Sequence, residues 1–126
     1  MLVMAGSRYL AVTRRDSDLI GLPGGKVDSG ENELEAIARE VEEEVGLLLD
    51  PALFKPVFKM VCRGDVDYET TGFTYPDLSI DEISSIVPEE GLAVRFVMKE
   101  ALCDPRSTPF AEYNAKLFEA VEEITQ

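Results

Sequence analysis

The pattern of apolar and polar residues predicts that the chain opens in a β-sheet. Residues 2–4 and 9–13 are rich in β-favouring residues, and the turn residues 5–7 between them favour a hairpin. Three later segments have the same character and predict further strands: residues 57–62, 71–75 and 92–98. Residues 76–88 mix Pro, Ser and Asp, and their pattern leaves the structure of this stretch open.

A helical period replaces the strand pattern between residues 33 and 45. Apolar residues recur there at the spacing of an amphipathic helix with one buried face: Leu34, Ile37, Ala38, Val41 and Val45. Asn32 is placed to cap the first turn, with Glu35 as its capping-box partner. Gly46 is placed to end the helix in a left-handed conformation.

The C-terminal residues repeat the helical period and predict a second helix. The repeat runs through a set of apolar residues: Phe110, Tyr113, Leu117, Val121 and Ile124. Two helices and several strands, without strict alternation of strand and helix, predict an α/β sandwich around a mixed sheet. A chain of 126 residues is long enough to bury one core, so residues 1–126 are interpreted as a single domain.

The charge balance and the absent residue types narrow the range of functions. Twelve basic against 25 acidic residues give a net charge of −13, which disfavours nucleic acid and anionic membranes as partners and favours cations. No apolar run approaches the roughly 20 residues that span a bilayer, and no signal segment opens the chain, so a cytoplasmic protein is expected. The absence of His excludes Ser-His-Asp triads, Cys-His pairs and His-ligated zinc. Cys62 and Cys103 are interpreted as reduced thiols without a function.

Three carboxylates share one face of the first predicted helix. Glu40, Glu43 and Glu44 are spaced i, i+3 and i+4, beside the apolar stripe. Like charges at this spacing repel each other, and a divalent cation would offset the repulsion. Oxygen ligands without nitrogen or sulfur suit Mg²⁺ or Mn²⁺. Taken alone, however, a Glu-rich helix face is more often a solvated surface.

A glycine-rich loop precedes this helix at a fixed spacing. Pro23, Gly24 and Gly25 interrupt regular structure. From Gly25 onward, nine specified positions of a 23-residue motif are filled: Gly25, Glu31, Arg39, Glu40, Val41, Glu43, Glu44, Gly46 and Leu47. This pattern is similar to the complete signature of the Nudix hydrolases. Residues 9–15 and 88–97 also resemble the lead-in strand and the later loop and strand of that family.

The resemblance implies a fold and a metal site. The fold would be the Nudix-type α/β/α sandwich, with a mixed β-sheet between helices. Glu40, Glu43 and Glu44 would bind Mg²⁺, or Mn²⁺ in its place, helped by the backbone carbonyl of Gly25. Glu90 would supply a further ligand, with Glu89 as the alternative and a solvated loop without a metal role as the other interpretation.

Further catalytic and binding roles follow from the same resemblance. Glu40 would double as the base that activates water, and Glu31 is a second candidate for that role or for supporting the ligands. Arg39 would hold the carboxylates in place through a bidentate ion pair. Arg15 would contact a substrate phosphate, unless it is an ordinary surface charge.

Recognition of the substrate base would depend on residues outside the motif. Four aromatic residues are candidates for stacking on a base, although each also fits a buried core: Phe73, Tyr75, Phe110 and Tyr113. Family members that cleanse the nucleotide pool read the purine with a polar residue just before the C-terminal helix. Phe110 stands at that place here, so Asn114 or Glu112 would have to take this part.

The sequence therefore predicts Mg²⁺-dependent hydrolysis of a phosphoanhydride bond in a nucleoside diphosphate derivative. The short chain favours a (deoxy)nucleoside triphosphate as the small nucleotide substrate, with ADP-ribose or a dinucleotide as alternatives. A catalytically silent Nudix-fold module that binds a nucleotide is a second hypothesis. A Ca²⁺-binding domain is a third, because residues 65–69 resemble the start of a calcium loop, although they lack its Gly and distal Glu. The protein is expected to be a monomer or a homodimer.

Overall fold

The computed structural model describes residues 1–24, 27, 29–62 and 68–125. Gly25, the expected carbonyl ligand, lies outside the described residues, as do the first residues of the calcium-loop hypothesis, Asp65 to Asp67. None of the described helices is long and apolar enough to cross a membrane.

The chain opens in the expected hairpin. Strand β1, Leu2–Ala5, pairs with the antiparallel strand β2, Arg8–Arg14, and Met4 lies opposite Tyr9. The turn between the strands contains Gly6 with φ 64°, a left-handed conformation that glycine adopts without a steric penalty. β2 then becomes the strand around which one half of the sheet is built.

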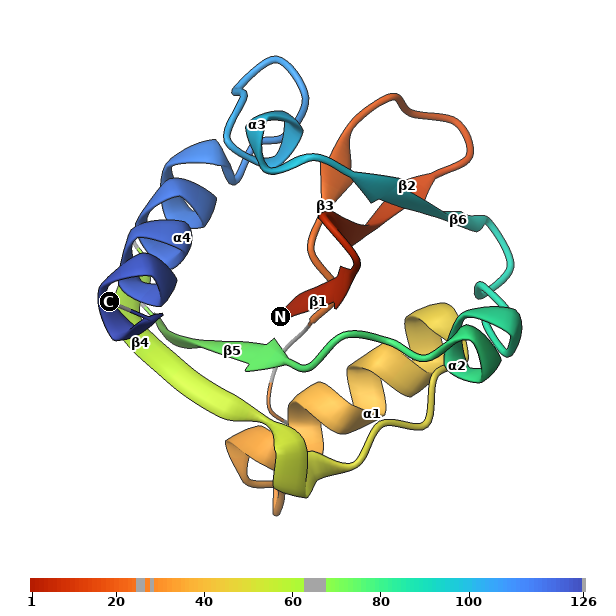
Figure 1. The fold of residues 1–126 in the computed structure, drawn as a ribbon, viewed down its shortest axis with the longest axis horizontal. Coiled ribbons are helices and arrows are strands. Elements are labelled where there is room, and N and C mark those ends of the chain that lie inside the picture. The colour runs from red at the N-terminus through yellow and green to blue at the C-terminus, as the bar shows by residue number, and fades with distance from the viewer. Residues whose placement is uncertain (25–26, 28, 63–67, 126) are drawn as a thin grey trace.

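Six strands among the described residues form one mixed sheet (Figure 1). β6, Leu92–Val97, and the short β3, Ile20–Gly21, both pair antiparallel with β2. β1 also pairs in parallel with β5, Tyr68–Tyr75, which in turn pairs antiparallel with β4, Lys55–Cys62. The parallel β1–β5 pair therefore joins the two antiparallel halves.

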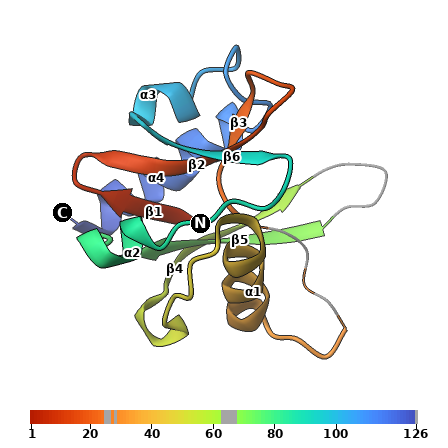
Figure 2. The ribbon, with the colours of Figure 1, turned by 90° about the vertical axis from the view of Figure 1, so that its right-hand side faces the viewer.

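Helices cover the two faces of this sheet. Along β1 and β2 neighbouring residues alternate between the faces: Val3 and Leu10 pack in one core cluster, and Leu2 and Ala11 pack in the other. The first cluster includes Val41 and Val45 of helix α1, Glu33–Val45, and the second includes Leu117 and Phe118 of helix α4, Ala111–Thr125. Strands lie between α1 and α4 in Figure 1, and Figure 2 shows α1 beneath β4 and β5.

Helix α1 begins and ends where the sequence predicts. The Glu35 N–H donates to Asn32 Oδ1 at 2.8 Å, which satisfies a backbone donor of the first turn. The Glu35 carboxylate accepts from Asn32 Nδ2 at 2.7 Å, so it returns to the side chain of the cap. At the other end Gly46 has φ 74°, and its N–H donates to the Glu42 carbonyl at 2.9 Å.

Several short elements of the structure were not predicted from the sequence. The undecided stretch contains helix α2, Ile80–Ser84, which opens with a capping box between Ser79 and Glu82. Helix α3, Lys99–Leu102, follows β6, and a 3-10 turn, Pro51–Leu53, precedes β4. Each is too short to show a full apolar period, and this explains why periodicity did not reveal them.

Candidate active site

The three carboxylates of the α1 face differ in their exposure to solvent. Glu43 is the outermost, with 54% of its side chain exposed, whereas the Glu40 side chain is 19% exposed. Glu44 lies next to the fully buried Val45, and its carboxylate turns toward the glycine-rich loop. The face therefore runs from solvent into the edge of the core, as its position beside the apolar stripe predicts.

Arg39 joins the carboxylates at the solvent side of this face. Its Nε and Nη2 atoms donate to the two oxygens of Glu31, at 2.8 and 3.1 Å. Its Nη1 atom lies 2.9 Å from Glu40 Oε1 and 3.2 Å from Glu43 Oε2. One guanidinium thus fixes three carboxylates, and Glu31 receives the bidentate pair that suits this planar donor.

Glu44 has the most perturbed acidity of the described carboxylates of α1. Burial raises the pKa of Glu44 from 4.5 to about 7, and the negative charges of Glu40 and Glu89 act in the same direction. The Gly24 N–H opposes this shift by donating to Glu44 Oε1 at 2.9 Å. The Met1 amino group donates to the Pro23 carbonyl at 2.9 Å, and its charge opposes the shift where the amine is protonated; burial lowers the pKa of this amine to about 5. Glu44 is therefore a carboxyl that gains or loses its proton near neutral pH.

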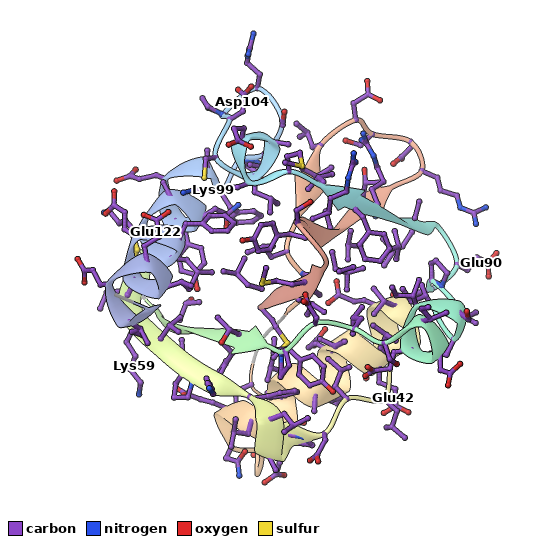
Figure 3. All side chains as sticks on the ribbon, viewed as in Figure 1. Glu42, Lys59, Glu90, Lys99, Asp104 and Glu122 are labelled. Carbon is purple, nitrogen blue, oxygen red and sulfur yellow. The ribbon has the colours of Figure 1, made fainter. Side chains whose placement is uncertain are left out.

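The loop before β6 brings Glu89 to this end of α1. The Glu89 N–H donates to the Glu44 carbonyl at 2.9 Å, and the Glu89 charge contributes to the raised pKa of Glu44. Glu89 and Glu90 are both exposed, and Figure 3 shows the Glu90 side chain pointing outward from the loop. The geometry thus favours Glu89, the alternative of the sequence interpretation, over Glu90 as the additional acidic group beside Glu44.

The oxygen donors of this face fit Mg²⁺ in their chemistry, because carboxylates are the ligands that hard divalent cations prefer. Glu40 and Glu43 already converge on one positive group, Nη1 of Arg39. However, no group of three or more acidic, Cys or His side chains among the described residues is arranged to hold a metal ion. Holding one would require the carboxylates of this face to lie closer together.

Comparison with protein families decides the identity of the chain. Residues 1–121 match the NUDIX domain. The chain belongs to this family. The match confirms the resemblance drawn from the motif, so the carboxylate face of α1 is the Nudix motif of a Nudix hydrolase.

Solved structures share the Nudix fold at low sequence identity. The MutT protein from Methanosarcina mazei Go1 has a TM-score of 0.74 at 20% identity, covering 99% of this chain and 91% of that chain. A dihydroneopterin triphosphate pyrophosphohydrolase from E. coli has a TM-score of 0.67 at 20% identity, covering 94% and 89%. An Ap4A hydrolase from C. elegans has a TM-score of 0.66 at 14% identity, covering 98% and 95%. These matches confirm the predicted α/β fold class, whereas curated proteins give no match.

Arg15 lies on the same edge of this Nudix domain as the loop that carries Glu89. Its N–H donates to the Gly91 carbonyl at 3.0 Å, and its Nε donates to the Leu92 carbonyl at 3.3 Å. The side chain is exposed, and these backbone contacts hold it near the start of β6. This placement is compatible with a phosphate contact, and the role of Arg15 stays a prediction.

Phe73 and Tyr75 are core residues of the sheet. They are 4% and 7% exposed, and both rings contact the ring of Phe54. The Tyr75 hydroxyl donates to Glu82 of α2 at 3.3 Å, which gives the buried ring a polar partner. Stacking on a nucleotide base requires an open ring face, so we do not include these two residues in the proposed site.

Phe110 and Asn114, the expected base-contacting residues, differ sharply in exposure. Phe110 is 55% exposed and precedes α4, so its ring is available to a ligand. Asn114 is 1% exposed, and its Nδ2 donates to the Leu102 carbonyl at 2.8 Å, which ties α4 to the end of α3. Glu112 is exposed and pairs with Lys116. Tyr113 packs against the α4 core cluster, so Phe110 is the best placed of these residues.

Sequence reasoning missed the role of Gly24. Its N–H is the hydrogen-bond donor that holds Glu44, yet the motif begins only at the following glycine. Gly24 has φ 155°, and an added Cβ would lie 3.3 Å from the Ile37 side chain. The paired glycines of the loop were the available signal, because adjacent glycines often mark a close approach of the backbone to another group.

Proposed function

We propose that this Nudix hydrolase uses Mg²⁺ to hydrolyse a phosphoanhydride bond in a nucleoside diphosphate derivative. The main support is the arrangement of carboxylates at the α1 face. Arg39 forms ion pairs with Glu31, Glu40 and Glu43. Glu44 accepts a hydrogen bond from the Gly24 N–H. The face places several acidic oxygens at the edge of a core, where their charge is costly without a cation.

In this proposal the residues of the α1 face have different roles. Glu40, Glu43 and Glu44 would hold the metal, with Glu89 as the additional acidic group from the loop before β6. A bound Mg²⁺ supplies neutralisation of phosphate charge and makes deprotonation of water easier. Arg39 keeps Glu31 and the ligand carboxylates in register, because its five N–H donors have a fixed geometry.

Two carboxylates are the main candidates for the general base that deprotonates water. The family resemblance implies Glu40, whose Oε1 accepts a hydrogen bond from Arg39 Nη1 at 2.9 Å. Glu44 has a pKa of about 7, which matches a group that takes a proton from water near neutral pH. Glu31 is a weaker candidate, because both of its oxygens accept from Arg39.

A (deoxy)nucleoside triphosphate is the substrate class that we favour. The E. coli structure is named for action on a triphosphate and the C. elegans structure for action on a dinucleotide, at almost equal structural similarity. The fold therefore does not select between these classes. Arg15 and Phe110 are both exposed, so they would be open to a phosphate group and to a base, and their exposure supports a nucleotide substrate.

A nucleotide panel tests the proposal directly. The protein would be incubated with Mg²⁺ and with nucleoside triphosphates, ADP-ribose or diadenosine polyphosphates, and phosphate and pyrophosphate release would be measured with and without EDTA. We expect release from at least one triphosphate that EDTA abolishes. Release from ADP-ribose or a dinucleotide alone would show that the substrate class is not a nucleoside triphosphate. Nucleotide binding without any release would favour the catalytically silent binding module.

A further inference from the structure

The segment between α2 and β6 is bonded to the C-terminal end of α1 through backbone groups. The Val87 N–H donates to the Val45 carbonyl and the Glu89 N–H donates to the Glu44 carbonyl, each at 2.9 Å. The last carbonyls of a helix have no partner inside the helix, and here a segment distant in sequence satisfies two of them. The end of α1 and residues 87–89 therefore form one backbone junction.

Gly46 lies at this junction, where it leaves no room for a side chain. A Cβ at residue 46 would lie 2.8 Å from the Val87 carbonyl oxygen and 3.0 Å from the Val87 nitrogen, closer than the 3.4 Å at which ordinary contact begins. Both atoms belong to the backbone, so no side-chain rotation relieves the clash. Gly6 offers a contrast, because its φ of 64° is similar to the 74° of Gly46, but a Cβ there would meet no atom within 4 Å.

The junction determines where Glu89 stands relative to Glu44. Glu89 belongs to the bonded segment, because its own N–H donates to the Glu44 carbonyl at 2.9 Å. The Glu44 carboxylate itself is held by the Gly24 N–H at 2.9 Å. Because Glu44 is fixed from the loop and from its own helix, a displacement of residues 87–89 changes mainly the position of Glu89.

We propose that Gly46 is a positioning residue of the hydrolytic site: by admitting the backbone of residues 87–89 against the end of α1, it sets the separation of the Glu89 and Glu44 carboxylates. Gly46 touches neither the substrate nor the metal and acts through Glu89. This inference rests on the proposed function, because the separation affects turnover only if these carboxylates serve hydrolysis.

Two pairs of variants separate the clash from backbone strain. Gly46→Ala and Gly6→Ala both place a Cβ on a left-handed residue, but only the first meets the Val87 backbone. Gly46→Asn and Gly6→Asn repeat the comparison with a residue that tolerates the left-handed conformation. We expect both Gly46 variants to lower kcat at least tenfold and to raise the Mg²⁺ concentration for half-maximal activity, with KM for the nucleotide within twofold. Both Gly6 variants should keep kcat within twofold of the parent.

Amide hydrogen exchange measures the protection of the junction amides and does not depend on enzymatic activity. In the parent protein the Val87 and Glu89 amides should be protected, and in Gly46→Asn they should exchange at least tenfold faster while the amides within β2 keep their protection. Unprotected Val87 and Glu89 amides in the parent would overturn the junction itself, even if neither Gly46 variant folded.

The activity outcomes separate this inference from the function on which it rests. An active parent enzyme and fully active Gly46→Asn protein would overturn the positioning role and leave the proposed function standing. Equal losses of kcat in the Gly46 and Gly6 variants would also overturn it. A parent protein without hydrolytic activity would overturn the function, whereas the exchange measurement would still report on the junction.

Discussion

Arg39 and Glu31 form a two-pronged ion pair, in which Nε lies 2.8 Å from Oε2 and Nη2 donates to Oε1 at 3.1 Å. The pair joins helix α1 to the loop that precedes it, and both side chains are less than one third exposed. The third nitrogen of the same guanidinium is left to face Glu40 and Glu43. Glu31 therefore orients the guanidinium that contacts Glu40 and Glu43, the two proposed metal ligands.

The first prediction concerns the geometry of this pair. Arg39→Lys keeps the charge but loses the planar fork, so it cannot hold Glu31 and the two ligand carboxylates together. We expect kcat/KM to fall at least tenfold, and the free energy of unfolding to fall by about 1–2 kcal/mol because charged hydrogen bonds are lost. Steady-state kinetics and urea unfolding measure the two effects.

The matched control uses the other bidentate pair among the described residues. Arg106 donates through Nε and Nη2 to the two oxygens of Asp104, far from α1 in sequence, and its side chain is 90% exposed. Arg106→Lys should leave kcat/KM within twofold and cause no measurable change in stability, because solvent screens an exposed pair. An equal loss of activity in both variants would contradict a specific role for the Arg39 fork.

The second prediction tests whether two carboxylates of the α1 face, Glu43 and Glu44, serve hydrolysis. Glu44→Gln and Glu43→Gln should each lower turnover by orders of magnitude at saturating Mg²⁺ without unfolding the protein, because each removes a charged ligand and leaves the size of the side chain unchanged. Glu42→Gln is the control, since Glu42 lies on the same helix and is exposed at its surface (Figure 3). Full activity of the Glu44→Gln enzyme would contradict the assignment of Glu44 to the hydrolytic site.

The elements with a full apolar period were predictable from the sequence. α1 shows its period, its cap and its terminal glycine within one stretch of sequence, so local signals sufficed. α2 and α3 each span about one turn, and a single turn has no period to detect. The parallel pairing of β1 with β5 is likewise invisible locally, because it depends on how distant segments pack.

From helical geometry alone, the candidate site was predictable only where residues are neighbours on α1. The shared face of Glu40, Glu43 and Glu44 follows from helical geometry alone. The contact of Glu89 with the end of α1 depends on the path of the loop after α2, so two adjacent acidic residues could not be distinguished in the sequence. The burial of Asn114 has the same origin, because it depends on how α3 packs against α4.

The third prediction distinguishes the two adjacent acidic residues of that loop. Glu89 acts on Glu44 through its charge, whereas Glu90 points outward. Glu89→Gln should therefore raise the Mg²⁺ concentration for half-maximal activity severalfold, and Glu90→Gln should leave it unchanged. A Mg²⁺ titration of the initial rate at fixed nucleotide measures both variants, and the reverse order would restore Glu90 as the additional ligand.

The fourth prediction concerns the pH dependence of stability in the metal-free protein. The pKa of Glu44 is about 7 in the folded chain and 4.5 ordinarily, so the folded state binds this proton more tightly. The stabilising contribution of the protonated carboxyl is therefore complete below pH 4.5 and is lost as the pH rises toward 7.

The Met1 amine has the opposite effect on the pH dependence of stability, because burial lowers its pKa to about 5. We therefore compare variants: the stability of Glu44→Gln minus that of the parent should increase between pH 4.5 and 7. Urea unfolding in EDTA across this range measures the difference, and a flat curve would contradict the raised pKa of Glu44.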